Sequence, residues 1–412
     1  MVNNENTITV FEHQILRTDR GEKCLTEDQL KALQSYYGNG VPYFSLVHHG
    51  VQFNEYVGVL QIGKTLIEVL PKADKFVGEK DTWRTMLIDM LRTVNGFEIK
   101  ATSNANLKTK PNTVLDLYFE LFVKEVEYLL HSGLVKKYRK KEGNNNALKG
   151  NLLFAKNIQK NVTHQERFFT RFTTYDVVHP LNQILYKTIQ LLKKINTSSA
   201  PNSRLGALML NFPEMPDIKI SETLFNKIIL NRKTQIYKRA LDIAKMILLQ
   251  YHPDLSRGKN DVLALMFDMN VLWEQFVYIS LKKHNSDRNL ITAQTTKHFW
   301  KPSGGRRSSM KPDIVINKLN GETLVLDTKW KNLNGYNPSP DDLRQLYVYH
   351  QFYDAEKVAL VYPGNSEIKK GTYFKGDGSD SAQECSIITL PVAKNIKDWQ
   401  IEICAQIKEW GS

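Results

Sequence analysis

KPDIVINKLNGETLVLDTKW, residues 311–330, decides the fold class of the C-terminal part of the chain. Two apolar runs flank a turn-forming Asn-Gly pair, which predicts a β-hairpin. Asp313 opens the first strand. Asp327 and Lys329 end the second strand, and because they are two positions apart their side chains point to the same face. The hairpin therefore predicts that two acids and one lysine meet at one of its ends.

The length of the turn sets which residues of the two strands face each other. If the Asn-Gly pair forms the centre of a two-residue turn, Asp313 lies opposite residue 328, between Asp327 and Lys329. A shift of one residue in the turn brings Asp313 directly opposite Asp327. Both registers let the three side chains reach one site, so the sequence leaves the choice open.

The triplet of an acid, any residue and a lysine has little value by itself. Only the triplet at 327–329 ends an apolar strand whose partner strand opens with Pro-Asp. Pro216-Asp217 imitates that opening, but no apolar strand ending in the triplet follows it. Chance copies of the triplet occur at Glu98–Lys100, Asp217–Lys219 and Glu367–Lys369.

Acids and a lysine in this arrangement suit the hydrolysis of a phosphodiester bond. Carboxylates can hold Mg²⁺, with Mn²⁺ as an alternative, while a lysine orients the attacking water or neutralises charge in the transition state. Glu274 joins the set because its helical sequence MNVLWEQFVYISL is otherwise apolar, although a solvated helix face is the alternative. The predicted metal ligands are Asp313, Asp327 and Glu274, and Lys329 is predicted to be catalytic.

Further candidates lie on both sides of the hairpin. Gln345 and Tyr349 are four positions apart on a predicted helix and share one face. We expect Gln345 to act in catalysis and Tyr349 to contact DNA, with a core position as the alternative for the tyrosine. Basic residues before the hairpin are expected to contact the DNA backbone, unless they belong to a merely solvated loop. These are Arg306, Arg307 and Lys311.

The composition fits a basic globular protein. The 412 residues carry a formal net charge of +13, which favours a polyanionic partner such as nucleic acid. A basic cluster at 136–141 has an open role, because DNA, a protein partner or solvent would explain it equally. The 3 cysteines are widely separated and suit a reducing cytoplasm. No membrane-spanning run and no secretory signal is visible.

The pattern of apolar residues predicts an α+β protein with several domains. Residues 1–95 are predicted to be a β-rich domain with a short helix starting at Thr26. Residues 96–254 are predicted to be mainly helical, with a basic loop. Residues 255–412 are predicted to be an α/β domain with a mixed sheet flanked by helices. This domain is expected to open with one helix over 261–284.

Residues 58–65, GVLQIGKT, match the P-loop pattern for nucleotide binding. A P-loop needs a helix that begins at the lysine, so that its N-terminus faces the phosphates. Here the sequence that follows, TLIEVLPK, alternates as a strand does. Gly63-Lys64 is therefore predicted to be the turn of a β-hairpin, and we expect no nucleotide on this chain.

Several segments resemble the McrC family, the nuclease subunits of McrBC-type modification-dependent restriction systems. Their shared order along the chain is more specific than any one of them, and the family's Asp-Ala-Lys is Asp-Thr-Lys here. The matching segments are YVGVLQIGKTLIEVLPK, LKGNLLFAKNI, NVLWEQFVYISLKK, KPDIVI, LVLDTKWK and QLYVYHQFY followed by ALVYP.

The resemblance implies a PD-(D/E)xK nuclease core in residues 255–412 and Mg²⁺-dependent cleavage of double-stranded DNA. It also implies a hexameric AAA+ GTPase partner of the McrB type, which binds modified DNA, translocates it and drives cleavage. Residues 1–95 would contact that ring, and the nucleotide would belong to the partner. A stand-alone PD-(D/E)xK nuclease in repair or defence, or a non-catalytic DNA-binding assembly subunit, are the alternatives.

Overall fold

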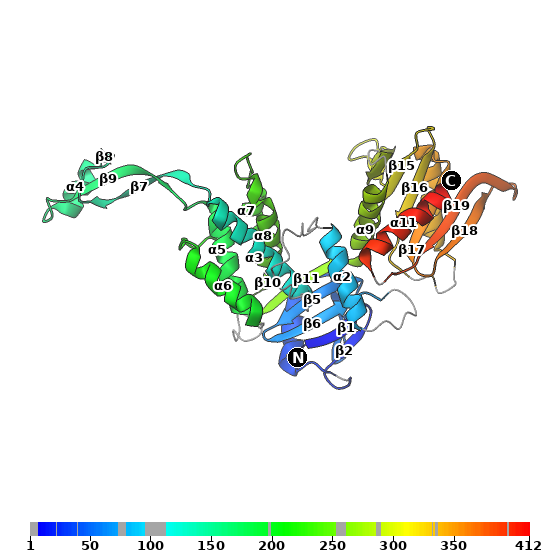
Figure 1. Cartoon of the computed structure of the whole chain (residues 1–412), viewed down its shortest axis with the longest axis horizontal. Coiled ribbons are helices and arrows are strands. Elements are labelled where there is room, and N and C mark those ends of the chain that lie inside the picture. The colour runs from blue at the N-terminus through cyan, green and yellow to red at the C-terminus, as the bar shows by residue number, and fades with distance from the viewer. Residues whose placement is uncertain are drawn as a thin grey trace. The chain divides into compact units, whose positions relative to one another are not determined.

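The computed structural model describes residues 7–21, 23–38, 40–72, 80–94, 113–196, 199–252, 261–285, 290–331, 333, 337–393 and 395–412. The chain divides into two compact units (Figure 1). The first unit combines Met1–Val114 with Met266–Ser412, and the second is Leu115–Leu265. Each unit contains helices as well as β-sheet, so the predicted α+β class is confirmed. The predicted division into three domains stays a prediction.

The N-terminal part of the first unit is rich in β structure. β1 (Thr7–Phe11) pairs in parallel with β6 (Thr65–Leu70), which pairs antiparallel with β5 (Tyr56–Ile62). A second, three-stranded sheet has the order β2-β4-β3. Its strands are β2 (Ile15–Arg17), β3 (Phe44–Val47) and β4 (Gly50–Phe53), and the unit's first two helices are α1 (Glu27–Tyr37) and α2 (Lys80–Val94).

Two sequence predictions about this region are confirmed. Thr26 caps α1, since its side chain accepts a hydrogen bond from the Gln29 N–H and the Gln29 side chain accepts one from the Thr26 N–H. Gly63-Lys64 is a tight hairpin turn, with Ile62 paired to Thr65 and Gly63 in the left-handed region at φ 56°. Strand β6 follows this turn where a P-loop would require a helix.

The C-terminal part of the first unit is a six-stranded mixed sheet in the order β12-β15-β16-β17-β19-β18. Strands β16, β17 and β19 run parallel, while the other pairings are antiparallel. The bounds are β12 (Ile291–Ala293), β15 (Ile314–Asn317), β16 (Thr323–Thr328), β17 (Lys357–Pro363), β18 (Glu367–Phe374) and β19 (Asp380–Leu390). A separate two-stranded sheet is formed by β13 (Lys297–Trp300) and β14 (Ser308–Met310).

Helices cover this sheet on both faces. Helix α10 (Pro340–Tyr353) connects β16 to β17 and packs on one face, as expected for a crossover between parallel strands. Helices α9 (Met269–His284) and α11 (Ile396–Gly411) pack on each other and on the sheet. Because side chains alternate along a strand, Val325 joins the α10 core while Leu324 lies against Gly411 of α11.

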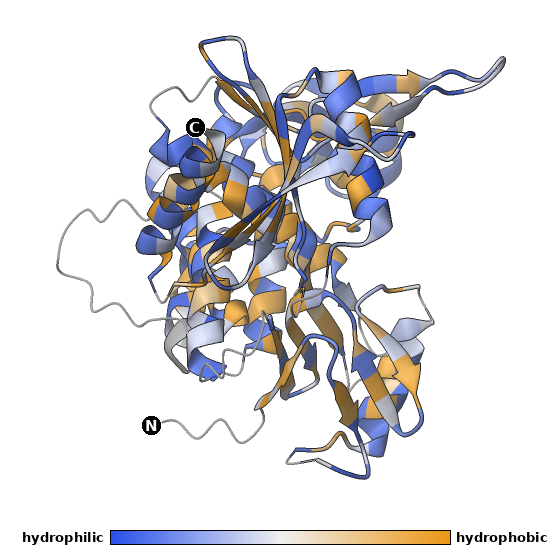
Figure 2. Ribbon diagram, turned by 90° about the vertical axis from the view of Figure 1, so that its right-hand side faces the viewer, coloured by the Kyte–Doolittle hydropathy of each residue, from blue (hydrophilic) through white to orange (hydrophobic). Residues whose placement is uncertain are grey.

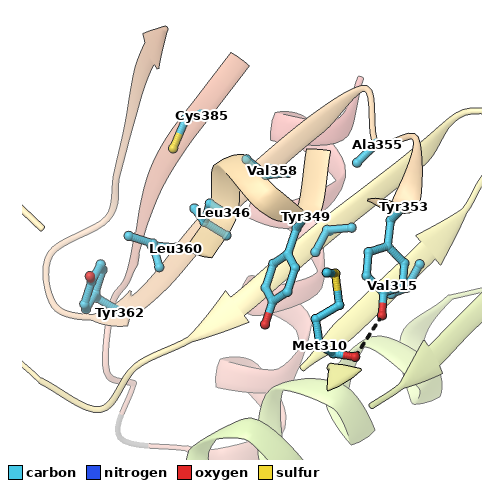
Figure 3. Packing of buried hydrophobic residues seen from close by; sticks show 11 residues of the cluster. Met310, Val315, Leu346, Tyr349, Tyr353, Ala355, Val358, Leu360, Tyr362 and Cys385 are labelled. Atoms are coloured by element: carbon cyan, nitrogen blue, oxygen red, sulfur yellow. Dashed lines mark hydrogen bonds between the residues drawn. The ribbon is translucent and has the colours of Figure 1, made fainter. Parts of the chain in front are cut away.

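Apolar residues gather along the strands and on the helix sides that face them (Figure 2). Figure 3 shows the core under α10, where Tyr349 and Tyr353 of that helix lie beside strand residues. The Tyr353 hydroxyl donates a hydrogen bond to the Met310 carbonyl oxygen at 3.3 Å. The α9 and α11 side is built on aromatic rings, with Trp273 and Trp399 at 5.5 Å between ring centroids.

The second unit consists of helices and a long β arm (Figure 1). The arm is formed by β7, β8, β9 and α4, and β7 and β9 pair over their whole length. The bounds are α3 (Val114–Ser132), β7 (Lys137–Asn145), β8 (Asn151–Leu152), α4 (Phe154–Asn161), β9 (Phe168–Asp176), α5 (Pro180–Ile195), α6 (Ser199–Asn211), α7 (Glu222–Asn226), α8 (Lys238–Leu249), β10 (Tyr251–His252) and β11 (Val262–Asp268).

Two expectations about secondary structure are wrong. The predicted helix over 261–284 is strand β11 followed by helix α9, because Asp268 caps α9 by accepting hydrogen bonds from the Asn270 and Val271 N–H groups. The basic cluster at 136–141 lies largely on strand β7 and not on a helix end or loop, since α3 ends at Ser132. In the described part of the chain, no helix is long and apolar enough to cross a membrane.

Candidate active site

The hairpin at 311–330 adopts the second of the two predicted registers. Ile314 pairs with Leu326, so one step outward Asp313 lies opposite Asp327. The connection is a three-residue loop, in which the Gly321 N–H donates to the Lys318 carbonyl oxygen at 3.0 Å. Gly321 has φ 90°, the left-handed conformation that closes such a loop. The two acids therefore stand at the same end of the hairpin.

Asp313 is held against the end of β16. The Thr328 N–H donates to Asp313 Oδ2 at 2.7 Å, and the Thr328 hydroxyl donates to the same oxygen at 2.8 Å. Both donors belong to Thr328 and converge on one oxygen of the Asp313 carboxyl group. This double contact fixes the Asp313 carboxylate beside Asp327.

Asp327 is the most buried acid of the site, with 2% of its surface exposed. Its Oδ2 pairs with Lys329 Nζ at 2.8 Å, and its Oδ1 accepts a hydrogen bond from Gln345 Nε2 at 3.3 Å. Burial and the charge of Asp313 raise the pKa of Asp327 to about 6, against the opposing effect of Lys329. One lysine thus does not balance the negative charge of the site.

Glu274 faces the same site from α9. It is half-buried, and its Oε1 accepts a hydrogen bond from Gln294 Nε2 at 2.7 Å. Burial and then the charge of Asp313 raise the pKa of Glu274, and Asp327 adds to this effect. The three predicted metal ligands are therefore close enough to repel one another.

Gln345 and Tyr349 share one face of α10, as predicted. Gln345 Nε2 donates to the Tyr349 hydroxyl oxygen at 2.6 Å as well as to Asp327. Tyr349 is 2% exposed and belongs to the core under α10 (Figure 3), and burial raises the pKa of its hydroxyl. The structure gives Tyr349 a core position that orients Gln345, while its contact to DNA stays a prediction.

The three basic candidates precede Asp313 along the chain and are exposed. Arg306 and Arg307 lie in the loop between β13 and β14, and both are exposed. Lys311 is exposed just before Asp313, and its charge opposes the rise in the pKa of Glu274, which places it near that carboxylate. Their exposure is compatible with contact to a polyanion, and that contact stays a prediction.

A model of the family described as "McrBC 5-methylcytosine restriction system component" matches residues 51–363. The chain belongs to this family. No protein among the curated ones matches it. The matched range contains every candidate residue from Glu274 to Tyr349.

Two similar chains in solved structures come from Thermococcus gammatolerans. A chain of the refined half-complex from the tetradecameric assembly of McrB AAA+ hexamers with bound McrC is 22% identical. The comparison covers 98% of this chain and 100% of that chain with a TM-score of 0.69. A chain of the McrBC complex solved by cryo-electron microscopy is 19% identical, with 67% and 87% coverage and a TM-score of 0.48.

The donor set of this McrBC family member fits a small divalent cation. Mg²⁺ usually keeps several waters and is held through one or two carboxylates, which Asp313 and Asp327 can supply. Among the described residues, no three His, Cys, Asp or Glu side chains are grouped so as to hold a metal by themselves. The residues therefore fit a cation that completes its shell with water and phosphate oxygens.

The other described acid-x-lysine triplets do not contain a buried acid at the end of an apolar strand. Asp217 is exposed and pairs with Lys187, and Glu367 pairs with Lys369 at 3.4 Å on exposed strand β18. The triplet at 98–100 lies outside the described residues. The two described copies therefore lack the buried acid found at Asp327, and the role of the triplet at 327–329 stays a prediction.

Two neighbours of the site were missed from the sequence. Asp342 lies between two lysines, with Oδ2 at 2.6 Å from Lys331 Nζ and Oδ1 at 4.0 Å from Lys329 Nζ. It was visible only as an acid in the first turn of a capped helix. Asn270 Oδ1 accepts a hydrogen bond from the Trp330 N–H at 3.2 Å, a contact that no sequence pattern indicates.

Neutralising Asp327 should stabilise the metal-free protein. The pKa of Asp327 is higher in the folded than in the unfolded protein. As pH rises from about 4 to 6, Asp327 therefore loses its proton first in the unfolded protein, and the free energy of unfolding falls. At pH 7.5 in a chelator, Asp327→Asn is expected to raise the free energy of unfolding by about 1–3 kcal/mol. Exposed Asp341→Asn serves as the control and should change little. A lower melting temperature for Asp327→Asn than for wild type would contradict the inference that the site carries excess negative charge.

Proposed function

We propose that this chain is the endonuclease subunit of a modification-dependent restriction system and hydrolyses DNA phosphodiester bonds with a divalent metal at a PD-(D/E)xK site. The observation that carries the proposal is the register of the hairpin. It sets Asp313 opposite Asp327, while Asp327 pairs with Lys329. Two acids and a lysine at one strand end are the parts that this chemistry needs.

Each residue has a role that follows from its contacts. Asp313 and Asp327, with Glu274 at the side, would hold Mg²⁺ or Mn²⁺, which when bound acidifies a water and offsets phosphate charge. Lys329 places a positive charge where negative charge builds up during hydrolysis. Gln345 fixes the rotamer of Asp327, and Tyr349 fixes Gln345.

The partner we propose is a hexameric AAA+ GTPase of the McrB type. Support comes from the family and from the shared fold with a chain of the Thermococcus gammatolerans assembly of McrB AAA+ hexamers with bound McrC. The partner would bind modified DNA and GTP, while residues 1–95 would contact the ring. Cleavage would then depend on GTP that is bound by the partner and not by this chain.

The two other functions predict different behaviour. A stand-alone nuclease would cut DNA without a GTPase. A non-catalytic subunit would cut no DNA, with or without a GTPase. The test mixes the chain with the AAA+ GTPase encoded next to it and methylated DNA. Cleavage that needs Mg²⁺ and GTP supports the proposal, and cleavage independent of GTP favours the stand-alone nuclease.

Removing the exposed arginines should weaken DNA binding and leave the chemical step intact. For Arg306→Ala with Arg307→Ala, we expect a higher KM and an unchanged kcat, because both arginines would contact the phosphate backbone. Losing two such contacts lowers the slope of log affinity against log salt by about 2. The control is Lys375→Ala, an exposed lysine in the turn between β18 and β19. An unchanged slope would show that the loop does not touch DNA.

A further inference from the structure

Glu12 is a buried carboxylate that the nuclease motif does not explain. It follows β1, and only 4% of its surface is exposed. Its Oε1 accepts two hydrogen bonds, one from the Lys72 N–H at 2.6 Å and one from Trp330 Nε1 at 2.8 Å. Burial raises the pKa of Glu12 to about 7 in spite of these two donors. A carboxyl group that is costly to bury thus sits against the residue next to Lys329.

Trp330 fixes the path of the chain immediately after the site. The Lys329 N–H donates to the Val361 carbonyl oxygen at 2.9 Å, and the Trp330 N–H donates to Asn270 Oδ1. The indole ring packs edge-on against Trp273, with 5.4 Å between centroids. The bond to Glu12 is the third polar anchor of this two-residue stretch. Three hydrogen bonds therefore hold this stretch, two through the backbone N–H groups of Lys329 and Trp330 and one through the Trp330 indole.

We propose that Glu12 is a positioning residue for the nuclease site, holding the Trp330 indole so that the preceding lysine stays directed at Asp327. This inference rests on the proposed function. Lys329 Nζ reaches Asp327 at 2.8 Å, and a shift of the backbone at Trp330 moves that nitrogen. Displacing a catalytic group by about 1 Å can cost up to 100-fold in rate. Through this bond the N-terminal sheet would support the geometry of the active site.

The test compares Glu12→Ala, Glu12→Gln, Trp330→Phe and the double variant Glu12→Ala/Trp330→Phe in the complete complex. Glu12→Ala and Trp330→Phe each remove one side of the bond, and we expect kcat to fall about 5- to 20-fold with KM unchanged. The double variant should be no slower than the slower single variant. Glu12→Gln keeps a carbonyl acceptor and should restore a rate close to wild type.

Hydrogen exchange provides a readout that does not depend on cleavage. In Glu12→Ala, peptides containing residues 327–331 should exchange faster than in wild type or Glu12→Gln. Unchanged exchange there, or additive losses in the double variant, would overturn the inference. A wild-type complex that exchanges as expected but never cuts DNA would instead refute the proposed function. Lower melting temperatures with unchanged kcat would leave Glu12 a structural residue only and also overturn the inference.

Discussion

Lys329→Ala is expected to lower the rate of DNA cleavage by at least about 100-fold, the usual loss when a preorganised charge is removed from a transition state. Its Nζ is the only lysine nitrogen that the described residues place within 4.0 Å of Asp327. Because removing Lys329 leaves the buried Asp327 carboxylate without its ion-pair partner, circular dichroism is used to check that the variant is folded. Cleavage of methylated DNA by the reconstituted complex measures the effect.

Lys331→Ala is the matched control for that experiment. Lys331 is two positions further along, and its Nζ pairs with Asp342 instead of Asp327. A partly exposed ion pair contributes up to about 1 kcal/mol, so the control should lose no more than about fivefold in rate. Equal losses in both variants would show that general charge near the DNA, and not the position of Lys329, supports cleavage.

Trp330→Ala is expected to destabilise the protein by about 3–5 kcal/mol, as for other large core aromatics. The ring is 6% exposed and lies between Trp273 and the Glu12 carboxylate. Its loss leaves a cavity and a buried carboxylate with one donor fewer. Urea unfolding followed by circular dichroism measures the change.

The exposed Trp300 provides the comparison for this stability measurement. It lies on β13 with 57% of its surface exposed, so Trp300→Ala should change the free energy of unfolding by no more than about 0.5 kcal/mol. A loss of less than about 1 kcal/mol for Trp330→Ala would mean that the ring is not part of the core that supports the site.

The hairpin could be predicted from the sequence because local signals agree there. Apolar alternation, an Asn-Gly turn and flanking acids are all readable within residues 311–330. The register could not be chosen, since an Asn-Gly pair fits both two- and three-residue loops. The bond between the Gly321 N–H and the Lys318 carbonyl oxygen decides it in the structure.

Other features escaped because they depend on distant partners. The run VLALMF in β11 is apolar throughout, and such a run does not distinguish a strand from a buried helix. The basic stretch of β7 becomes a strand only because it pairs with β9, which is rich in Phe and Thr. Glu12 and Trp330 are 318 positions apart, so no local pattern could connect them.

The most direct test of the central claim is cleavage of methylated DNA by the wild-type complex and by Asp327→Asn, each titrated with Mg²⁺ in the presence of GTP. Asp327→Asn keeps the size of the side chain and removes its charge. We expect the wild type to cut with saturable dependence on Mg²⁺, and the variant to lose at least about 100-fold in rate at every concentration. Equal cleavage by both proteins, or cleavage in a chelator, would contradict a metal site built on Asp327.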